Sequence, residues 1–61
     1  MKTTVLSLGD LAGTYRTFGA DGPVYLVIGK PEGGIVRVRV VESGEELDYP
    51  LAQALNDPEA E

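Results

Sequence analysis

Residues 35–49 constrain the fold more than any other segment, since they read I-V-R-V-R-V-V-E-S-G-E-E-L-D-Y. Valine alternating with arginine has the period of two that is typical of a strand with one buried face. The Ser43-Gly44 pair between two such runs predicts a β-hairpin with a two-residue turn. The register that follows pairs Glu42 with Glu45, Val41 with Glu46, Val40 with Leu47, Arg39 with Asp48 and Val38 with Tyr49.

The two faces of this predicted hairpin differ in character. Arg37 and Arg39 share the polar face, and two arginines at this spacing can hold a phosphate or a carboxylate. We prefer an ion-pair ladder with Glu46 and Asp48, because the neighbouring strand already supplies these partners. The apolar face consists of Val38, Val40, Leu47 and Tyr49.

Two further strands are predicted upstream. Residues 23–29 form a short apolar run between turn-forming residues, which is typical of a central strand covered on both faces. Residues 14–18 have the β-branched and aromatic composition of another strand, and the glycine-containing segment 19–22 would join the two. The chain therefore predicts a meander of four short strands.

The two ends of the chain follow different patterns. We expect residues 3–8 to form a short strand or extended arm that leads to a turn at 9–13, although Ser7 is also suited to cap one helical turn. Near the other end, Pro50 is placed to open a short helix that Asp57-Pro58 stops. Residues 58–61 are expected to be a flexible acidic tail.

The expected fold class is mainly β. We predict a small antiparallel meander of four to five strands, either an SH3-like barrel or a curled sheet, with a short C-terminal helix. One domain covers residues 1–57 and the tail follows it. Phe18 and one or more tyrosines are expected at the edge of a core made of Val24, Leu26, Ile28, Val36, Val38, Val40, Leu47, Leu51 and Leu55.

Missing residue types bound the chemistry. The chain has no histidine, cysteine or tryptophan, so the usual proton-transfer group, thiol nucleophile and transition-metal ligands are absent. Ser7 and Ser43 lack a histidine base, and only a Ser-Lys arrangement with Lys2 or Lys30 would remain. We therefore expect no enzymatic activity and no cofactor. No apolar run approaches the length of a membrane span, and the predicted location is the cytoplasm.

Three weaker patterns are better explained by structure than by binding. The G-K-P-E-G-G segment lacks the Gly-Lys-Ser/Thr order of a phosphate-binding loop, so it is expected to be a hairpin loop. The acids at 45, 46 and 48 lack the spacing of a calcium loop. The three tyrosines, which an exposed recognition patch would also explain, are more typical of half-buried residues at the rim of the fold.

Charge is sorted along the chain. All five basic residues precede position 40, so residues 1–39 carry five positive and three negative charges, a sum of +2, whereas residues 40–61 carry seven acids and sum to −7. Such a block attracts basic surfaces and repels nucleic acid. A solvated surface that keeps a small domain soluble is the alternative. The candidate partner-binding residues are Glu42, Glu45, Glu46, Asp48 and Asp57.

The patterns T-F-G-A-D-G-P-V-Y-L-V-I-G and V-R-V-R-V-V-E-S-G-E-E-L-D-Y-P-L carry a resemblance across residues 14–55. They resemble those of short uncharacterised proteins of bacteria and their mobile elements, a likeness that implies no activity and no catalytic residues. In size, acidity and lack of catalytic groups the chain is also similar to phage-encoded anti-CRISPR proteins, several of which act as DNA mimics. That second likeness implies an inhibitor that enters a nucleic-acid channel and names no target.

Two hypotheses follow. The first is a non-enzymatic acidic protein that blocks a basic, nucleic-acid-handling partner by charge mimicry, without binding nucleic acid or membrane itself. The second is a small structural, adaptor or antitoxin-like module. Such a module could form a homodimer through the strand edge at residues 14–18. Dimerisation would also supplement the small core that 61 residues can bury.

Overall fold

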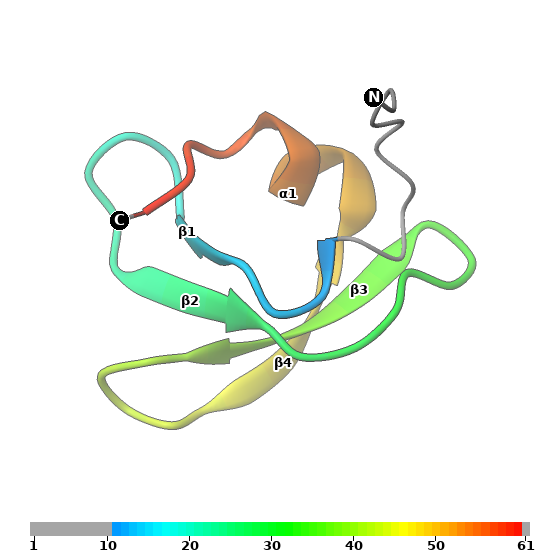
Figure 1. Cartoon of the computed structure of the whole chain (residues 1–61), viewed down its shortest axis with the longest axis horizontal. Coiled ribbons are helices and arrows are strands. Elements are labelled where there is room, and N and C mark those ends of the chain that lie inside the picture. Colours follow the sequence, from blue (N-terminus) through cyan, green and yellow to red (C-terminus); the bar gives the residue numbers. More distant parts are fainter. Residues whose placement is uncertain (1–10, 61) are drawn as a thin grey trace, which may run out of the picture.

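The four predicted strands are present and form one antiparallel sheet. The computed structural model describes residues 11–60 (Figure 1) and contains β1 (Tyr15–Thr17), β2 (Val24–Val27), β3 (Ile35–Val40), β4 (Glu46–Pro50) and helix α1 (Leu51–Asn56). Strand order in the sheet is β1-β2-β3-β4, so every strand pairs with its neighbour in sequence. The mainly β meander with a C-terminal helix is confirmed. The predicted strand or arm at residues 3–8 lies outside the described residues.

The β3–β4 hairpin forms with a register two residues away from the predicted one. Val38 lies opposite Leu47 and Arg39 opposite Glu46, and Val40 N–H donates to the Glu45 carbonyl at 2.8 Å. A two-residue turn of the favoured type needs positive φ at both central residues, and among residues 11–60 only glycines have it. The loop between β3 and β4 therefore spans residues 41–45 and includes Gly44 at φ 77°. A shift of two preserves the faces, as predicted.

The core lies between one face of the sheet and α1, and it differs in part from the predicted set. Val36 and Val38 are buried as expected, with Leu47 and Leu51 packed against the core, but β2 buries Tyr25 and Val27. The predicted Val24, Leu26 and Ile28 are half-buried instead. Every residue of β2 is apolar, so its sequence carries no alternation to show which face turns inward.

Helix α1 contributes a small residue to the core. Ala54 is fully buried, whereas Leu55, a predicted core residue, is 51% exposed. The helix begins directly after β4, and its backbone orientation is therefore set by the strand, not by its own two leucines. An alanine at the contact lets this short helix approach the sheet closely. Predicted core residue Val40 is half-buried at the end of β3.

The chain after α1 returns to the first strand. Thr17 N–H donates to the Pro58 carbonyl at 3.1 Å, and Ala60 N–H donates to the Tyr15 carbonyl at 2.8 Å. The β1 edge, which the homodimer hypothesis would use, is therefore occupied by the chain's own residues 58–60. The sequence also predicts that residues 58–61 are flexible, and this stays a prediction. Within residues 11–60 the four-stranded sheet is open and is not closed into a barrel.

Candidate functional site

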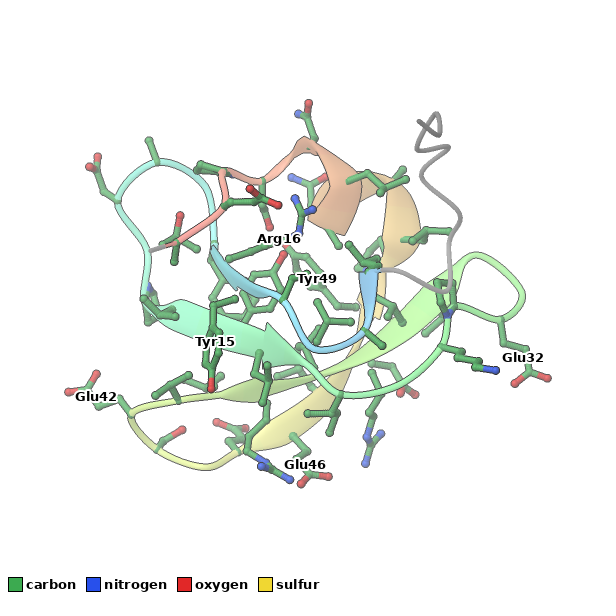
Figure 2. The ribbon with its side chains drawn as sticks, in the orientation of Figure 1. Tyr15, Arg16, Glu32, Glu42, Glu46 and Tyr49 are labelled. Carbon is green, nitrogen blue, oxygen red and sulfur yellow. The ribbon has the colours of Figure 1, made fainter. Side chains whose placement is uncertain are left out.

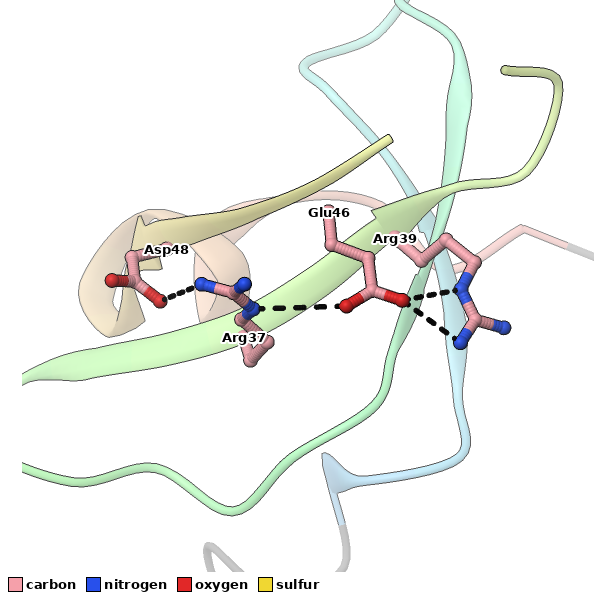
Figure 3. A network of polar contacts seen from close by, with 4 residues as sticks. All are labelled: Arg37, Arg39, Glu46 and Asp48. Carbon is pink, nitrogen blue, oxygen red and sulfur yellow. Dashed lines mark hydrogen bonds and ion pairs between the residues drawn. The ribbon is translucent and has the colours of Figure 1, made fainter. Parts of the chain in front are cut away.

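The polar face of the hairpin is an ion-pair ladder (Figure 3). Arg37 Nη1 lies 2.9 Å from Asp48 Oδ1, and Arg39 Nη2 lies 3.0 Å from Glu46 Oε2, which also accepts from Arg39 Nε at 3.1 Å. Arg37 Nε adds a longer contact of 3.9 Å to Glu46 Oε1. The predicted ladder is present with its partners moved by two residues. Its two cations balance its two anions.

Unbalanced charge on the hairpin is concentrated at its loop. Glu42 and Glu45 are exposed, and within residues 11–60 neither carboxylate has an ion-pair partner. Ser43 Oγ accepts the Glu45 N–H at 3.2 Å, a short-range bond that helps define the loop. Figure 2 shows Glu42 at one extremity of the molecule, pointing away from the sheet, while Glu46 projects from β4. The acidic loop, residues 41–45, is therefore the part of the candidate site that is free to attract a cation.

Asp57, the fifth candidate contact residue, lies apart from the other four and is only 6% exposed. Its Oδ2 accepts hydrogen bonds from Tyr25 Oη at 2.7 Å and Tyr49 Oη at 2.9 Å, and its Oδ1 accepts the Gly19 N–H at 3.1 Å. Burial alone would raise the pKa of this carboxyl, but the three donors and the Arg16 charge lower it below its ordinary value. The carboxylate is fully engaged inside the protein.

The tyrosines that hold Asp57 form an aromatic cluster with Phe18. Ring centroids lie 4.3 Å apart for Phe18 and Tyr25, and 5.1 Å apart for Phe18 and Tyr49 in an edge-to-face arrangement. Burial, followed by the hydrogen bond to Asp57, raises the pKa of the Tyr49 hydroxyl to about 12, and the same causes raise the pKa of Tyr25 further. Tyr15 is different, with 48% of its surface exposed on the outer face of the sheet.

Arg16 serves the fold in a way that the sequence analysis missed. Its Nη1 donates to the Ala54 carbonyl at 3.1 Å and to the Asp57 carbonyl at 3.0 Å, and its Nη2 lies 3.7 Å from Glu59. A cation beside these carbonyls stabilises the C-terminal end of α1. A single arginine between two strand-forming residues gives no signal of a contact with a helix 38 positions away.

These groups can make ionic and hydrogen-bonded contacts with another molecule. Among residues 11–60, no group of three or more acidic side chains is arranged to hold a metal ion. The described part of the chain also has no helix that is long and apolar enough to cross a membrane. The site thus consists of four exposed carboxylates on one hairpin, two of them neutralised by arginines.

The fold and the site describe a small, mainly β domain, which consists of a four-stranded meander with a terminal helix and an acidic hairpin. The chain belongs to the DUF5397 family, a family of unknown function whose model matches residues 2–61. This agrees with the resemblance to short uncharacterised proteins. No curated protein and no solved structure matches the chain.

Proposed function

We propose that this chain is a non-enzymatic binding protein that uses its acidic hairpin to occupy a basic surface on a nucleic-acid-handling protein. The observation that carries the proposal is the pair of exposed carboxylates at the hairpin end, Glu42 and Glu45, which have no ion-pair partner within residues 11–60. Exposed carboxylates at the end of a hairpin present uncompensated negative charge, as a phosphate backbone does. Such charge attracts a basic groove from a distance and speeds the encounter.

Burial and ion pairing support a narrower proposed contact surface than the five candidate residues. Glu42 and Glu45 are its centre, and Glu46 and Asp48 are its margin, because Arg39 and Arg37 already neutralise them. We leave Asp57 out, since its carboxylate is buried and bonded to Tyr25, Tyr49 and Gly19. A contact made by exposed charges should be weakened by salt, because screening acts most on exposed groups.

Two general properties support mimicry of nucleic acid over another kind of acidic contact. Residues 40–61 sum to −7 without one basic residue, and among residues 11–60 neither Glu42 nor Glu45 has an ion-pair partner to offset its charge. In size, acidity and lack of catalytic groups the chain resembles phage anti-CRISPR proteins, several of which act as DNA mimics. In this proposal the protein acts in the cytoplasm as an inhibitor encoded by a phage or mobile element.

A salt-gradient capture experiment tests the proposal. The tagged chain is immobilised, a bacterial lysate is applied, and bound proteins are eluted with increasing salt for wild type, Glu42→Lys and Glu45→Lys. Glu32→Lys is the matched control, because every single reversal changes the net charge from −5 by +2 to −3. Glu32 is also exposed and lies at the opposite extremity of the molecule from Glu42 (Figure 2).

We expect the wild type and Glu32→Lys to retain a basic nucleic-acid-binding protein that both hairpin variants retain about tenfold less well, which corresponds to a loss of about 1.4 kcal/mol. Equal losses in all three variants would show that only overall charge matters. Retention that is insensitive to salt would also contradict the proposal.

The second candidate function is an adaptor or antitoxin-like module. The observation in its favour is the outer face of the sheet, where Tyr15 and Val41 are 48% and 51% exposed and Leu26 is half-buried between the strands. Apolar groups exposed together can form the centre of a protein contact. Sedimentation at several concentrations tests self-association through this face: Tyr15→Ser should abolish a dimer formed there, and a wild type that stays monomeric contradicts the dimer.

A further inference from the structure

The edge of strand β1 that faces away from β2 is paired with another part of the same chain. Tyr15 C=O and Thr17 N–H point away from β2 and bind Ala60 N–H and the Pro58 carbonyl, in an antiparallel bridge that pairs Arg16 with Glu59. We call residues 57–60 the C-terminal strap. In Figure 1 the strap descends from α1 along β1 to the C-terminal end of the chain. This is the geometry by which an extended peptide is added to the edge of a sheet.

The receiving surface recognises more than an extended backbone. The Asp57 carboxylate binds the Tyr25 and Tyr49 hydroxyls and the Gly19 N–H, which come from two strands and a turn. Arg16 adds the Asp57 carbonyl at 3.0 Å and the Glu59 carboxylate at 3.7 Å. The surface is therefore specific for a short acidic segment that presents an aspartate followed by extended chain.

The unit that carries the strap is small. Helix α1 has six residues, no side-chain hydrogen bond at its N-terminus, and one fully buried side chain, Ala54. A helix of this length is not stable by itself in water. It joins β4 without an intervening loop, and at this junction Leu51 N–H donates to the Gly34 carbonyl at 2.8 Å.

We propose that the β1 edge also binds the C-terminal strap of a second copy of this chain, so that two molecules exchange straps and associate. A second copy carries the same aspartate and the same extended segment, so every contact of the closed monomer is made again between chains. The closed form prevails in dilute solution, because its strap is present at high effective concentration, and exchange grows with protein concentration. The inference does not depend on the function proposed above.

The absence of cysteine from the chain allows a direct test. Tyr15 and Ala60 lie opposite each other across the β1–strap bridge, where Cβ atoms are about 4.5–5.5 Å apart and near the reach of a disulfide. Full-length Tyr15→Cys and Ala60→Cys proteins are mixed, incubated at rising concentration and oxidised. A covalent dimer of one chain of each variant, resolved by mass spectrometry, reports exchange, because the two thiols otherwise belong to separate closed molecules.

Two controls define the outcome. The double variant Tyr15→Cys/Ala60→Cys should form an internal disulfide when dilute, which shows that both positions tolerate cysteine and are adjacent. A mixture of Tyr15→Cys with Glu32→Cys, whose thiol lies away from the strap, gives the level of random cross-linking. We expect the mixed Tyr15–Ala60 dimer to exceed that level and to about double when a small cross-linked fraction is measured at twice the concentration. A yield equal to the random level at every concentration would overturn the proposal.

Discussion

Asp57 joins three parts of the fold through one carboxylate. It receives hydroxyl hydrogen bonds from β2 and β4 and a backbone N–H from the turn after β1, at distances of 2.7 to 3.1 Å. A buried charge is tolerated when such donors replace its hydration. The core has only six buried apolar residues among those described, and this one group links two strands and a turn to the segment after α1.

Replacement of this carboxylate should therefore destabilise the protein more than replacement of any exposed acid. We predict that Asp57→Ala lowers the free energy of unfolding by about 2–4 kcal/mol, because three donors lose their acceptor, and that Asp57→Asn lowers it by about 1–3 kcal/mol. Glu59→Gln, an exposed neighbour with a 3.7 Å ion pair, should cost less than about 1 kcal/mol. Urea unfolding measures all three. Equal losses for Asp57→Asn and Glu59→Gln would contradict the anchoring role.

Titration of the same cluster should make stability depend on pH at both ends of the scale. The Asp57 carboxyl has a lowered pKa in the folded protein, so its contribution is present above the unfolded pKa of about 3.9 and is lost as pH falls below it. Tyr49 has a pKa raised to about 12, so its contribution is intact below the unfolded value of about 10 and is lost between that pH and 12.

A single phenylalanine substitution tests the predicted loss of stability at alkaline pH. We predict that the urea midpoint of Tyr49→Phe falls less steeply than that of the wild type between about pH 10 and 12. The reason is that one of the two hydroxyls with a raised pKa is gone. Tyr15→Phe is the matched control, because the Tyr15 hydroxyl belongs to an exposed residue away from Asp57. If Tyr49→Phe and Tyr15→Phe had the same alkaline profile, the coupling of Tyr49 to Asp57 would be wrong.

Among the elements, the β3–β4 hairpin depends on one backbone conformation. Gly44 has φ 77°, and a Cβ added there would meet no atom within 4 Å. Its substitution thus isolates the cost of the left-handed conformation from any clash. We predict that Gly44→Ala lowers the free energy of unfolding by about 1–2 kcal/mol and Gly44→Asn by less, because asparagine adopts this conformation more readily. Denaturant unfolding at one pH compares them, and an alanine that costs no more than asparagine would contradict the conformational explanation.

How far each element follows from the sequence depends on how local its cause is. The four strands, the face that β3 buries and the arginine ladder follow from alternation within a few residues, so the sequence predicts them. The register of the hairpin goes with the fact that only glycines among residues 11–60 have positive φ, and the inward face of β2 depends on which of its side chains join Val36, Val38 and Ala54 in the core. Those choices depend on backbone geometry and on contacts between distant segments, which an apolar run without alternation does not reveal.

The candidate site divides in the same way. Exposed acids at a hairpin loop were predictable from charge and turn chemistry, and the structure places Glu42 and Glu45 there. In the sequence, Asp57 is an acid after a short helix and resembles the hairpin acids. In the structure it faces two hydroxyls that lie 32 and 8 positions away in the chain. Nothing local distinguishes a carboxylate that meets solvent from one that meets a buried tyrosine.

At the scale of the whole molecule, the two edges of the sheet are managed differently. The β1 edge is covered by the C-terminal strap, while β4 carries Glu46, Asp48 and the proline Pro50, which discourage addition of another strand. Charge is equally asymmetric, because the ladder is neutral and the acidic loop is not. Within residues 11–60, unbalanced negative charge is thus gathered at the acidic loop, and the backbone edges of the sheet are occupied or blunted.

Competition with DNA for a captured partner tests the central claim of charge mimicry most directly. The partner is bound to the immobilised wild-type chain at low salt, duplex DNA of unrelated sequence is added, and the released fraction is measured against an equal concentration of uncharged polymer. We predict that DNA releases the partner in a dose-dependent way, because phosphates and the hairpin carboxylates would compete for the same basic surface. A stable complex that contains the chain, the partner and DNA together would contradict it.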